Sequence, residues 1–497
     1  MSYLFWSLPT LVIAGAIGIC RLNATYAALL GLIVTVPVAI FTGATPFHAG
    51  ELAQALARGA WIGATIALYI LGGLLFWQLA SQPSSAAPAD AAQARAPAGV
   101  HVVREQRRLL FFACFLVGPF AEAATGFGVG MVGTIALLRG MRIAPRHLMV
   151  FGLLSQTMIP WGAMSSGTLL AAAYARMDPT TLALYTMIPT ALLMPVWLAL
   201  FWRTARQAGI PTSRRECLRE AGWVGAGLAL VTVAVVYLGP ETSLLAVYGP
   251  LIVLCYLADS RPGRSQFLAI ARRMLPYVAL IAVLVATRIS PGLKATLAAL
   301  GSVAPFPDLP AWSPFLHAGS WLIAGGILTA VLRGHAAQLP RQAQSTWATG
   351  KHAVLTVFLF AMMAEVLASA GISQAFARQM FALLHQGALF VAPLCSAAFG
   401  ILSNSGNMPN SLFMSSQTAV AVQAGLSVPA VAALQHVSGT SMSLFSPVRM
   451  SIAAGLAHGR GQERHVYAAL LPYALAALAL IQLMALWVAL SSGAPGP

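Results

Sequence analysis

The chain has 497 residues, of which 59% are hydrophobic and only 8% are charged, and its mean hydropathy is +0.79. A soluble domain carries about 25% charged residues, so this composition excludes a soluble globular protein. It indicates an all-α polytopic membrane protein. The formal net charge of +16 comes from basic residues scattered over short loops, with few aromatic neighbours. That distribution favours orientation in a membrane over binding to nucleic acid.

No cofactor or metal is expected from the cysteines, which are widely spaced and form neither a metal-ligand pattern nor a disulfide framework. They are Cys20, Cys114, Cys217, Cys255 and Cys395. The first apolar run has no basic segment before it, and it continues beyond the length of a signal sequence. We therefore expect the first helix to stay in the membrane as an anchor.

Apolar stretches of about 17–25 residues predict membrane-spanning helices. Between the second and third expected spans, residues 46–59 are expected to form an amphipathic helix at the outer interface. Residues 81–108, rich in Ala, Ser and Pro, predict a cytoplasmic linker. Two apolar stretches, 109–138 and 389–420, are interrupted by Gly, Pro and polar residues. About twelve full spans are expected, over residues 4–20, 24–42, 60–80, 147–170, 182–202, 221–239, 243–258, 274–289, 318–333, 351–370, 429–455 and 466–490.

The loop charges predict the topology, because Lys and Arg collect on the cytoplasmic side. Of the 28 Lys and Arg, 22 fall in connections that one face can share, and five lie opposite: Arg58, Arg176, Arg288, Lys294 and Arg378. This division holds only if each interrupted stretch enters and leaves by one face. Residues 109–138 and 389–420 are therefore predicted re-entrant hairpins. Both chain ends are then predicted to lie outside the cytoplasm, which is the periplasm if the membrane is a bacterial inner membrane.

Each predicted hairpin is followed by a span with a polar, Gly- and Pro-containing middle, and then by a closing helix. The first hairpin opens from the inside and the second from the outside, which is the layout of inverted-topology repeats in secondary transporters. We expect one integral-membrane transporter domain, 1–497, with a first half at 1–202 and a second half at 203–497.

Two acids, Glu122 and Glu365, lie well inside predicted apolar stretches. An ionisable side chain at bilayer depth is costly and marks a functional site, so both are candidates for proton coupling. Glu122 has a structural alternative, as a hydrogen-bonded brace of its hairpin. Arg449 suits a substrate carboxylate, or else an ion pair within the protein. His436 is interpreted as a satisfied core histidine.

The substrate site is expected where broken helices free backbone groups, because helix N-termini attract anions. Polar groups there can bind a small organic anion, and a proton taken up with it would make the translocated unit neutral. The candidate substrate-binding residues are Thr125, Gly126, Gly128, Gln156, Asn404, Asn407, Asn410, Ser411, Ser438, Gly439, Ser446 and Arg449.

Several runs resemble the L-lactate permease family of bacterial inner-membrane transporters. They are Phe120-Ala121-Glu122-Ala123-Ala124-Thr125-Gly126-Phe127-Gly128, then Asn410-Ser411-Leu412-Phe413, Ser416-Gln417-Thr418-Ala419, Ser438-Gly439 and Ser446-Pro447. The resemblance implies a transporter, not an enzyme. It implies proton-coupled uptake of lactate, glycolate and related 2-hydroxymonocarboxylates, and a fold with paired re-entrant hairpins.

The chain departs from that family at two points. The family pattern has an Asp at the second hairpin tip and a Lys before Ser-Pro, whereas this tip offers Ser, Asn and Gly, and Arg449 follows Pro447. A sodium-coupled or exchange carrier for another anion, such as a dicarboxylate, therefore stays open. No His-Glu-x-x-His or Gly-x-Ser-x-Gly motif favours a membrane-embedded enzyme; a passive channel is a further alternative. The sequence leaves the oligomeric state open.

Overall fold

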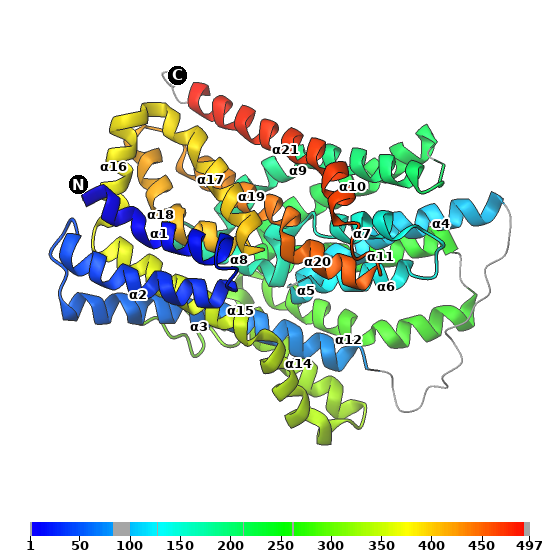
Figure 1. Cartoon of the computed structure of the whole chain (residues 1–497). Helices are drawn as coiled ribbons and strands as arrows, with labels where there is room; N and C mark the ends of the chain where they lie inside the picture. The colour runs from blue at the N-terminus through cyan, green and yellow to red at the C-terminus, as the bar shows by residue number, and fades with distance from the viewer. Residues whose placement is uncertain (1, 83–99, 127, 212, 261–262, 492–497) are drawn as a thin grey trace.

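In the computed structural model (Figure 1), residues 2–82, 100–126, 128–211, 213–260 and 263–491 are described. These residues are almost entirely helical. Within them no β-sheet forms, and an isolated antiparallel bridge joins Val303 to Trp312. The predicted all-α fold class is confirmed.

Within the described residues, the first part of the chain forms nine helices and two short irregular turns. They are α1 (Ser2–Gly18), α2 (Ala24–Thr42), α3 (Ala49–Ala80), α4 (Val100–Phe112), the π-helical turn η2 (Ala113–Val117), α5 (Gly118–Thr125), α6 (Val129–Leu138), α7 (Pro145–Leu154), the 3-10 turn η3 (Ile159–Trp161), α8 (Gly162–Ala175) and α9 (Pro179–Gln207).

The second part continues in the same all-helical manner. It contains α10 (Arg214–Leu238), α11 (Pro240–Ser260), α12 (Arg264–Ile289), α13 (Pro291–Ala299), α14 (Ala318–Leu332), η4 (Ala336–Gln338), α15 (Leu339–Ser369), α16 (Ile372–Leu384), η5 (His385–Gly387), α17 (Ala388–Ser403), α18 (Asn407–Gln423), α19 (Val428–Met442), η6 (Ser443–Phe445), α20 (Pro447–Leu456) and α21 (Glu463–Ser491).

Nine helical stretches of the described residues are long and apolar enough to cross a membrane. Eight of them fall on predicted spans, and the ninth, Glu105–Thr125, is the first arm of the predicted hairpin 109–138. The predicted spans 4–20 and 318–333 are the shorter helices α1 and α14. The predicted spans 147–170 and 429–455 are broken pairs, α7 with α8 and α19 with α20.

Local sequence explains where several of these helices begin. Pro179 opens α9, and the Asp178 side chain before it accepts a hydrogen bond from the Thr181 N–H at 2.8 Å. Ser213 caps α10 in the same way, since its hydroxyl accepts from the Glu216 N–H. A polar cap followed by proline is a strong start signal, because the first helical N–H groups have no partner inside the helix.

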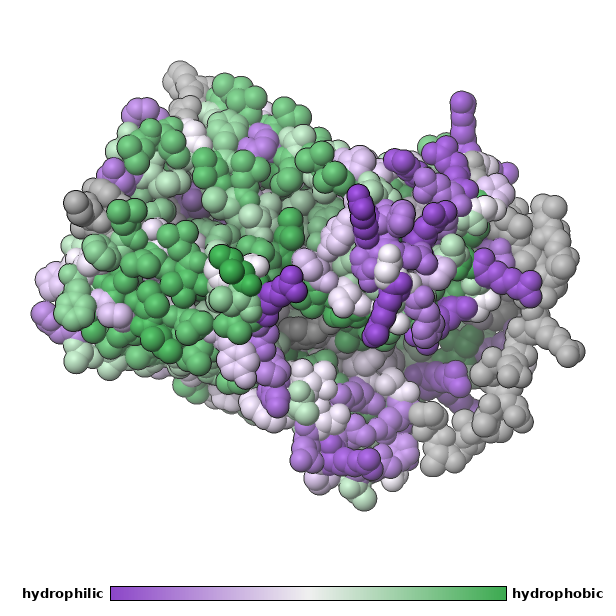
Figure 2. Space-filling model, viewed as in Figure 1, coloured by the Kyte–Doolittle hydropathy of each residue, from purple (hydrophilic) through white to green (hydrophobic). Residues whose placement is uncertain are grey.

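The helices run along one common direction between two chemically different ends (Figure 1). The start of α1 and the end of α21 lie at one end, whereas α4, α10 and α12 begin at the other, which we call the basic end. In Figure 2, apolar side chains gather over α1 and α2, and polar side chains gather towards the basic end. This separation is what a bilayer requires of a protein that spans it.

Two helical hairpins and two broken helices lie inside this bundle. α5 packs against α6, and α17 packs against α18. The order hairpin, broken helix and closing helix occurs twice, ending in α9 the first time and in α21 the second. Figure 1 shows α4 leading into the first hairpin from the basic end, while α17 starts near α16 at the other end. The membrane faces of the two hairpins stay predictions.

Two local predictions need correction. The predicted linker 81–108 is helical in its last part, because α4 begins at Val100; residues 83–99 lie outside the described part. Residues 46–59 do not form a separate interfacial helix, since α3 runs without a break from Ala49 to Ala80. Gly59 lies so close to the backbone of Met362 on α15 that a Cβ atom would not fit. Helix packing therefore buries one side of this segment, at Ala55 and Gly59.

Candidate functional site

Glu122 lies on α5 and is only 4% exposed. Its Oε1 accepts a hydrogen bond from the Gly128 N–H at 3.1 Å, and its Oε2 accepts from the Gly130 N–H and the Gln156 amide, each at 3.1 Å. Gly128 and Gly130 lie at the start of α6, where free N–H groups and the helix dipole favour a negative charge. The carboxylate thus joins both arms of the first hairpin to the broken helix α7–α8.

Glycine makes this hairpin turn possible. Gly126 and Gly128 have φ values of +73° and +84°, which are strained for other residues. A Cβ atom on Gly126 would lie 2.7 Å from the Cβ of Ala163 in α8. The tip of the first hairpin therefore rests directly on the broken helix, and its backbone conformation depends on the absence of side chains.

Replacing Gly130 with alanine should destabilise the hairpin strongly. A Cβ atom there would collide with the Gly118 carbonyl of the opposite arm, and overpacking of this kind costs about 1–3 kcal/mol. Thermal unfolding of the purified protein should show a lowered melting temperature. Gly133→Ala is the matched control on the same helix, because a Cβ atom at Gly133 meets nothing within 4 Å. Equal melting temperatures for the two variants would contradict the packing described.

The broken helix α7–α8 contributes a strained, buried segment. Ala163, Met164 and Ser165 have φ values of +48°, +55° and +57°, a left-handed run of three non-glycine residues. Left-handed backbone costs about 1–2 kcal/mol per residue, and such strain clusters at functional sites. Just before this run, the Oε1 atom of Gln156 is buried without a hydrogen-bond partner. The Oε1 atom of Gln156 is therefore an unsatisfied hydrogen-bond acceptor next to Glu122.

Arg449 lies in the first turn of α20, after Ser446, whose hydroxyl caps the helix by accepting from the Val448 N–H. The side chain is buried, at 5% exposure. Its Nε donates to Oδ1 of Asn404, at the tip of the second hairpin, at 2.7 Å, whereas its Nη1 has no hydrogen-bond partner. Among the described residues no carboxylate forms an ion pair with Arg449. A buried guanidinium in this state is costly unless an anion completes it.

A chain of hydrogen bonds fixes the orientation of Asn410 in the second hairpin. The Thr168 hydroxyl donates to the Pro160 carbonyl at 2.6 Å, so it accepts from Nε2–H of His436, at 3.0 Å. His436 Nδ1 is then the acceptor for the Asn410 amide Nδ2–H, at 2.9 Å. Asn410 Oδ1 consequently points away from His436, and it is buried without a partner. His436 connects α19 to both α8 and α18.

Other predicted binding residues use their polar groups within the protein. The Ser438 hydroxyl donates to the Pro393 carbonyl, Ser411 contacts the Tyr174 hydroxyl, and Thr125 donates to the Ala121 carbonyl. Asn407 lies against Gly167, and Gly439 lies against Gly400 where α19 packs on α17. These residues lie in the same hairpins and broken helices, and the hydrogen bonds of Ser438, Ser411 and Thr125 stabilise those elements.

Glu365 on α15 occupies a different site, an ion-pair network that we call the outer network. Its carboxylate is 2% exposed and pairs with Arg58 at 2.9 Å and with Arg176 at 2.8 Å. Both arginines also contact Asp308 in the loop before α14. Hydrogen bonding to Arg58 lowers the pKa of Asp308, so Asp308 is charged at neutral pH. The sequence analysis did not predict this network. The available signal was that Arg58 and Arg176 both belong to the face predicted to be poor in basic residues.

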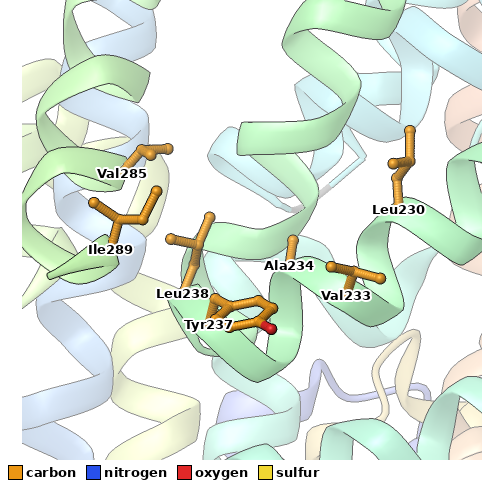
Figure 3. Close-up of a pocket in the computed structure, with 7 residues that line it drawn as sticks. All are labelled: Leu230, Val233, Ala234, Tyr237, Leu238, Val285 and Ile289. Carbon is orange, nitrogen blue, oxygen red and sulfur yellow. The ribbon is translucent and has the colours of Figure 1, made fainter. Parts of the chain in front are cut away.

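Two surface grooves of the described part do not contain these polar residues. One, of about 430 Å³, lies between α10 and α12 and is lined by the apolar side chains shown in Figure 3. In contrast, Glu122, Gln156, Asn410 and Arg449 are all at most 5% exposed. The candidate site is therefore closed to solvent in this conformation.

The described residues form a multi-pass helical bundle with broken helices around buried polar groups, an arrangement that is typical of membrane transporters. Residues 311–491 match the family model described as L-lactate permease, which confirms the predicted family resemblance for the part from before α14 to the end of α21. That part includes Glu365, Asn410, His436 and Arg449, while Glu122 lies outside it.

The whole fold has a weaker likeness to a solved structure, the YdaH transporter of Alcanivorax borkumensis. The similarity covers 95% of this chain and 99% of that chain, at 15% sequence identity and a TM-score of 0.41. A structural similarity this weak does not assign a fold or a function to this chain, so the fold class is based on the observed helices alone. No curated protein matches the sequence.

Proposed function

We propose that this protein is a proton-coupled transporter for a small 2-hydroxymonocarboxylate such as lactate or glycolate. The observation that carries the proposal is Arg449, whose buried guanidinium has a free Nη1 group and no carboxylate partner among the described residues. It lies beside the tip of the second hairpin through its bond to Asn404. A substrate carboxylate supplies the missing charge and hydrogen bonds.

The proposal of a monocarboxylate rests on the count of available positive charges. In the described hairpins and broken helices, α5–α8 and α17–α20, Arg449 is the buried arginine that lacks a carboxylate partner; Arg139, Arg142 and Arg146 are exposed. One buried cation balances one substrate carboxylate when Glu122, which attracts Arg449 electrostatically, is neutralised by the co-transported proton. A dicarboxylate would leave a second charge uncompensated in a low-dielectric site, at a cost of several kcal/mol.

The free Oδ1 of Asn410 supports recognition of a hydroxyl group. The hydrogen bonds through His436 and Thr168 hold the Asn410 amide with its N–H group towards the histidine, which leaves Oδ1 as an acceptor. A hydroxyl donor on the substrate satisfies such an acceptor, and an analogue without it leaves a buried polar group unpaired. We therefore propose that lactate is preferred over propionate.

Glu122 is proposed as the proton site. In the conformation described, its two oxygens accept three hydrogen bonds from groups on α6 and α7–α8. Protonation replaces one of these acceptor positions with an O–H donor, so it loosens the contact between the two arms of the hairpin and the broken helix. Uptake of one proton with one anion also makes the translocated unit neutral, which reduces the cost of crossing the membrane core.

Proteoliposomes loaded with buffer and placed under an inward proton gradient test this function. Wild-type protein should accumulate labelled lactate, up to about tenfold for a gradient of one pH unit at 1:1 coupling, since tenfold corresponds to about 1.4 kcal/mol. Glu122→Gln should lose this accumulation while lactate still exchanges across the membrane. Glu105→Gln, an exposed acid on α4, is the control and should behave as wild type.

Two results would contradict the proposal. Uptake that responds neither to the gradient nor to Glu122→Gln would exclude proton coupling at this residue. A requirement for sodium, or competition by succinate in place of lactate, would exclude the proposed coupling ion or substrate.

A further inference from the structure

A second surface groove lies where α9 ends and α10 begins, at the basic end of the molecule. Its volume is about 470 Å³, and it is lined by Trp202, Arg206, Arg214, Cys217, Leu218 and Ala221. None of these residues belongs to the candidate transport site. Unlike the apolar groove in Figure 3, this one combines two guanidinium groups with an apolar wall.

The charges of Arg206 and Arg214 are not neutralised within the described part of the chain. Both side chains are exposed, and neither forms an ion pair there. The nearby acids have other partners: Glu220 binds Arg107 and the Trp202 indole, and Asp259 binds Arg108 and Arg219. The groove therefore presents two positive charges to whatever occupies it.

The position of Arg214 does not stabilise the helix that contains it, α10. It is the first residue of α10, where the helix dipole favours acids and disfavours cations. At an exposed position this costs up to about 1 kcal/mol, and an anion bound in the groove would offset that cost.

The rest of the groove is suited to a lipid tail. Leu218 is 74% exposed on α10, and Ala221 follows it one turn later on the same side of the helix. The Trp202 ring is held in place because its N–H donates to Oε2 of Glu220 at 2.7 Å. Tryptophan at the end of a membrane-spanning helix is typical of the headgroup region.

We infer that this groove binds an anionic phospholipid from the cytoplasmic leaflet, with its phosphate between Arg206 and Arg214 and an acyl chain along Leu218 and Ala221. Basic clefts between membrane helices on the cytoplasmic side bind such headgroups. A bound lipid would join the end of α9 to the start of α10. Since α9 packs on α19 and α21, the lipid would stabilise the closing helix of the first repeat against the second.

Thermal unfolding of the full-length protein in detergent, with added lipid, tests the inference. Phosphatidylglycerol should raise the melting temperature of the wild type more than phosphatidylcholine does. The double variant Arg206→Gln/Arg214→Gln should lose at least half of that lipid-specific shift. Arg272→Gln/Arg273→Gln removes the same charge from exposed positions on α12 and should keep the full shift.

Three outcomes would overturn the site. Equal shifts with both lipids would show that headgroup charge is not recognised. Equal losses in the two double variants would show a general effect of charge. A shift of the same size with inorganic phosphate would show that a soluble anion, and not a lipid, occupies the groove. Native mass spectrometry of the same proteins should show the lipid bound to wild type and absent from the groove variant.

Discussion

Replacing Arg449 with glutamine is expected to reduce lactate uptake by more than about 100-fold. Removing one partner of a buried, hydrogen-bonded charge pair costs about 2–5 kcal/mol, and Arg449 is the buried cation that we assign to the substrate carboxylate. Arg449→Lys should not retain full transport, because an ammonium group cannot form the planar, bidentate hydrogen bonds that a guanidinium forms with a carboxylate. Initial rates of labelled lactate uptake into proteoliposomes measure the effect.

The thermal stability of the Arg449→Gln variant distinguishes a substrate-binding function of Arg449 from a structural one. Arg449→Gln removes a buried charge that has no acid partner among the described residues, so the variant should melt at or above the wild-type temperature. It should no longer be stabilised by lactate. Arg139→Gln is the control, since Arg139 is exposed and donates to the Leu456 carbonyl near α20. Uptake within threefold of wild type, or loss of folding, would contradict the assignment.

The long helices were predictable because their signals are local. Apolar length fixes where a chain can span a membrane, and eight of the long stretches fall on predicted spans. The continuity of α3 was not predictable, because Glu51 and Arg58 make residues 46–59 look interfacial. Arg58 is stabilised by Glu365 and Asp308, which are about 250 to 310 positions away in sequence. A single sequence does not show such long-range pairs.

The candidate site was predictable only in part, for a related reason. Glu122 and Arg449 stand out because ionisable groups inside apolar stretches are rare and costly. Hydroxyl groups carry less information: Ser438 binds the Pro393 carbonyl in place of a ligand, since serine hydroxyls often donate to backbone carbonyls. The left-handed run at Ala163, Met164 and Ser165 has no glycine. No local sequence pattern predicts this left-handed conformation.

The outer network explains why the two buried acids are not equivalent. Glu122 binds backbone and amide groups of the hairpin and the broken helix, whereas Glu365 binds two arginines at once. The other acidic partner of these two arginines among the described residues is Asp308, which is half-exposed, so the charge of the buried Glu365 holds the network together. We therefore propose Glu122 alone for proton coupling and a structural function for Glu365.

Glu365→Gln is accordingly expected to lower stability by about 3 kcal/mol, because it leaves two partly buried arginines without a full charge partner. The melting temperature should fall well below that of Asp308→Asn, since the Asp308 side chain is 52% exposed and water screens its pairs. Where enough folded Glu365→Gln protein remains, the proton gradient should still drive lactate accumulation. The opposite pattern, a normal melting temperature with lost coupling, would make Glu365 the proton site, because a purely structural acid cannot change coupling without changing stability.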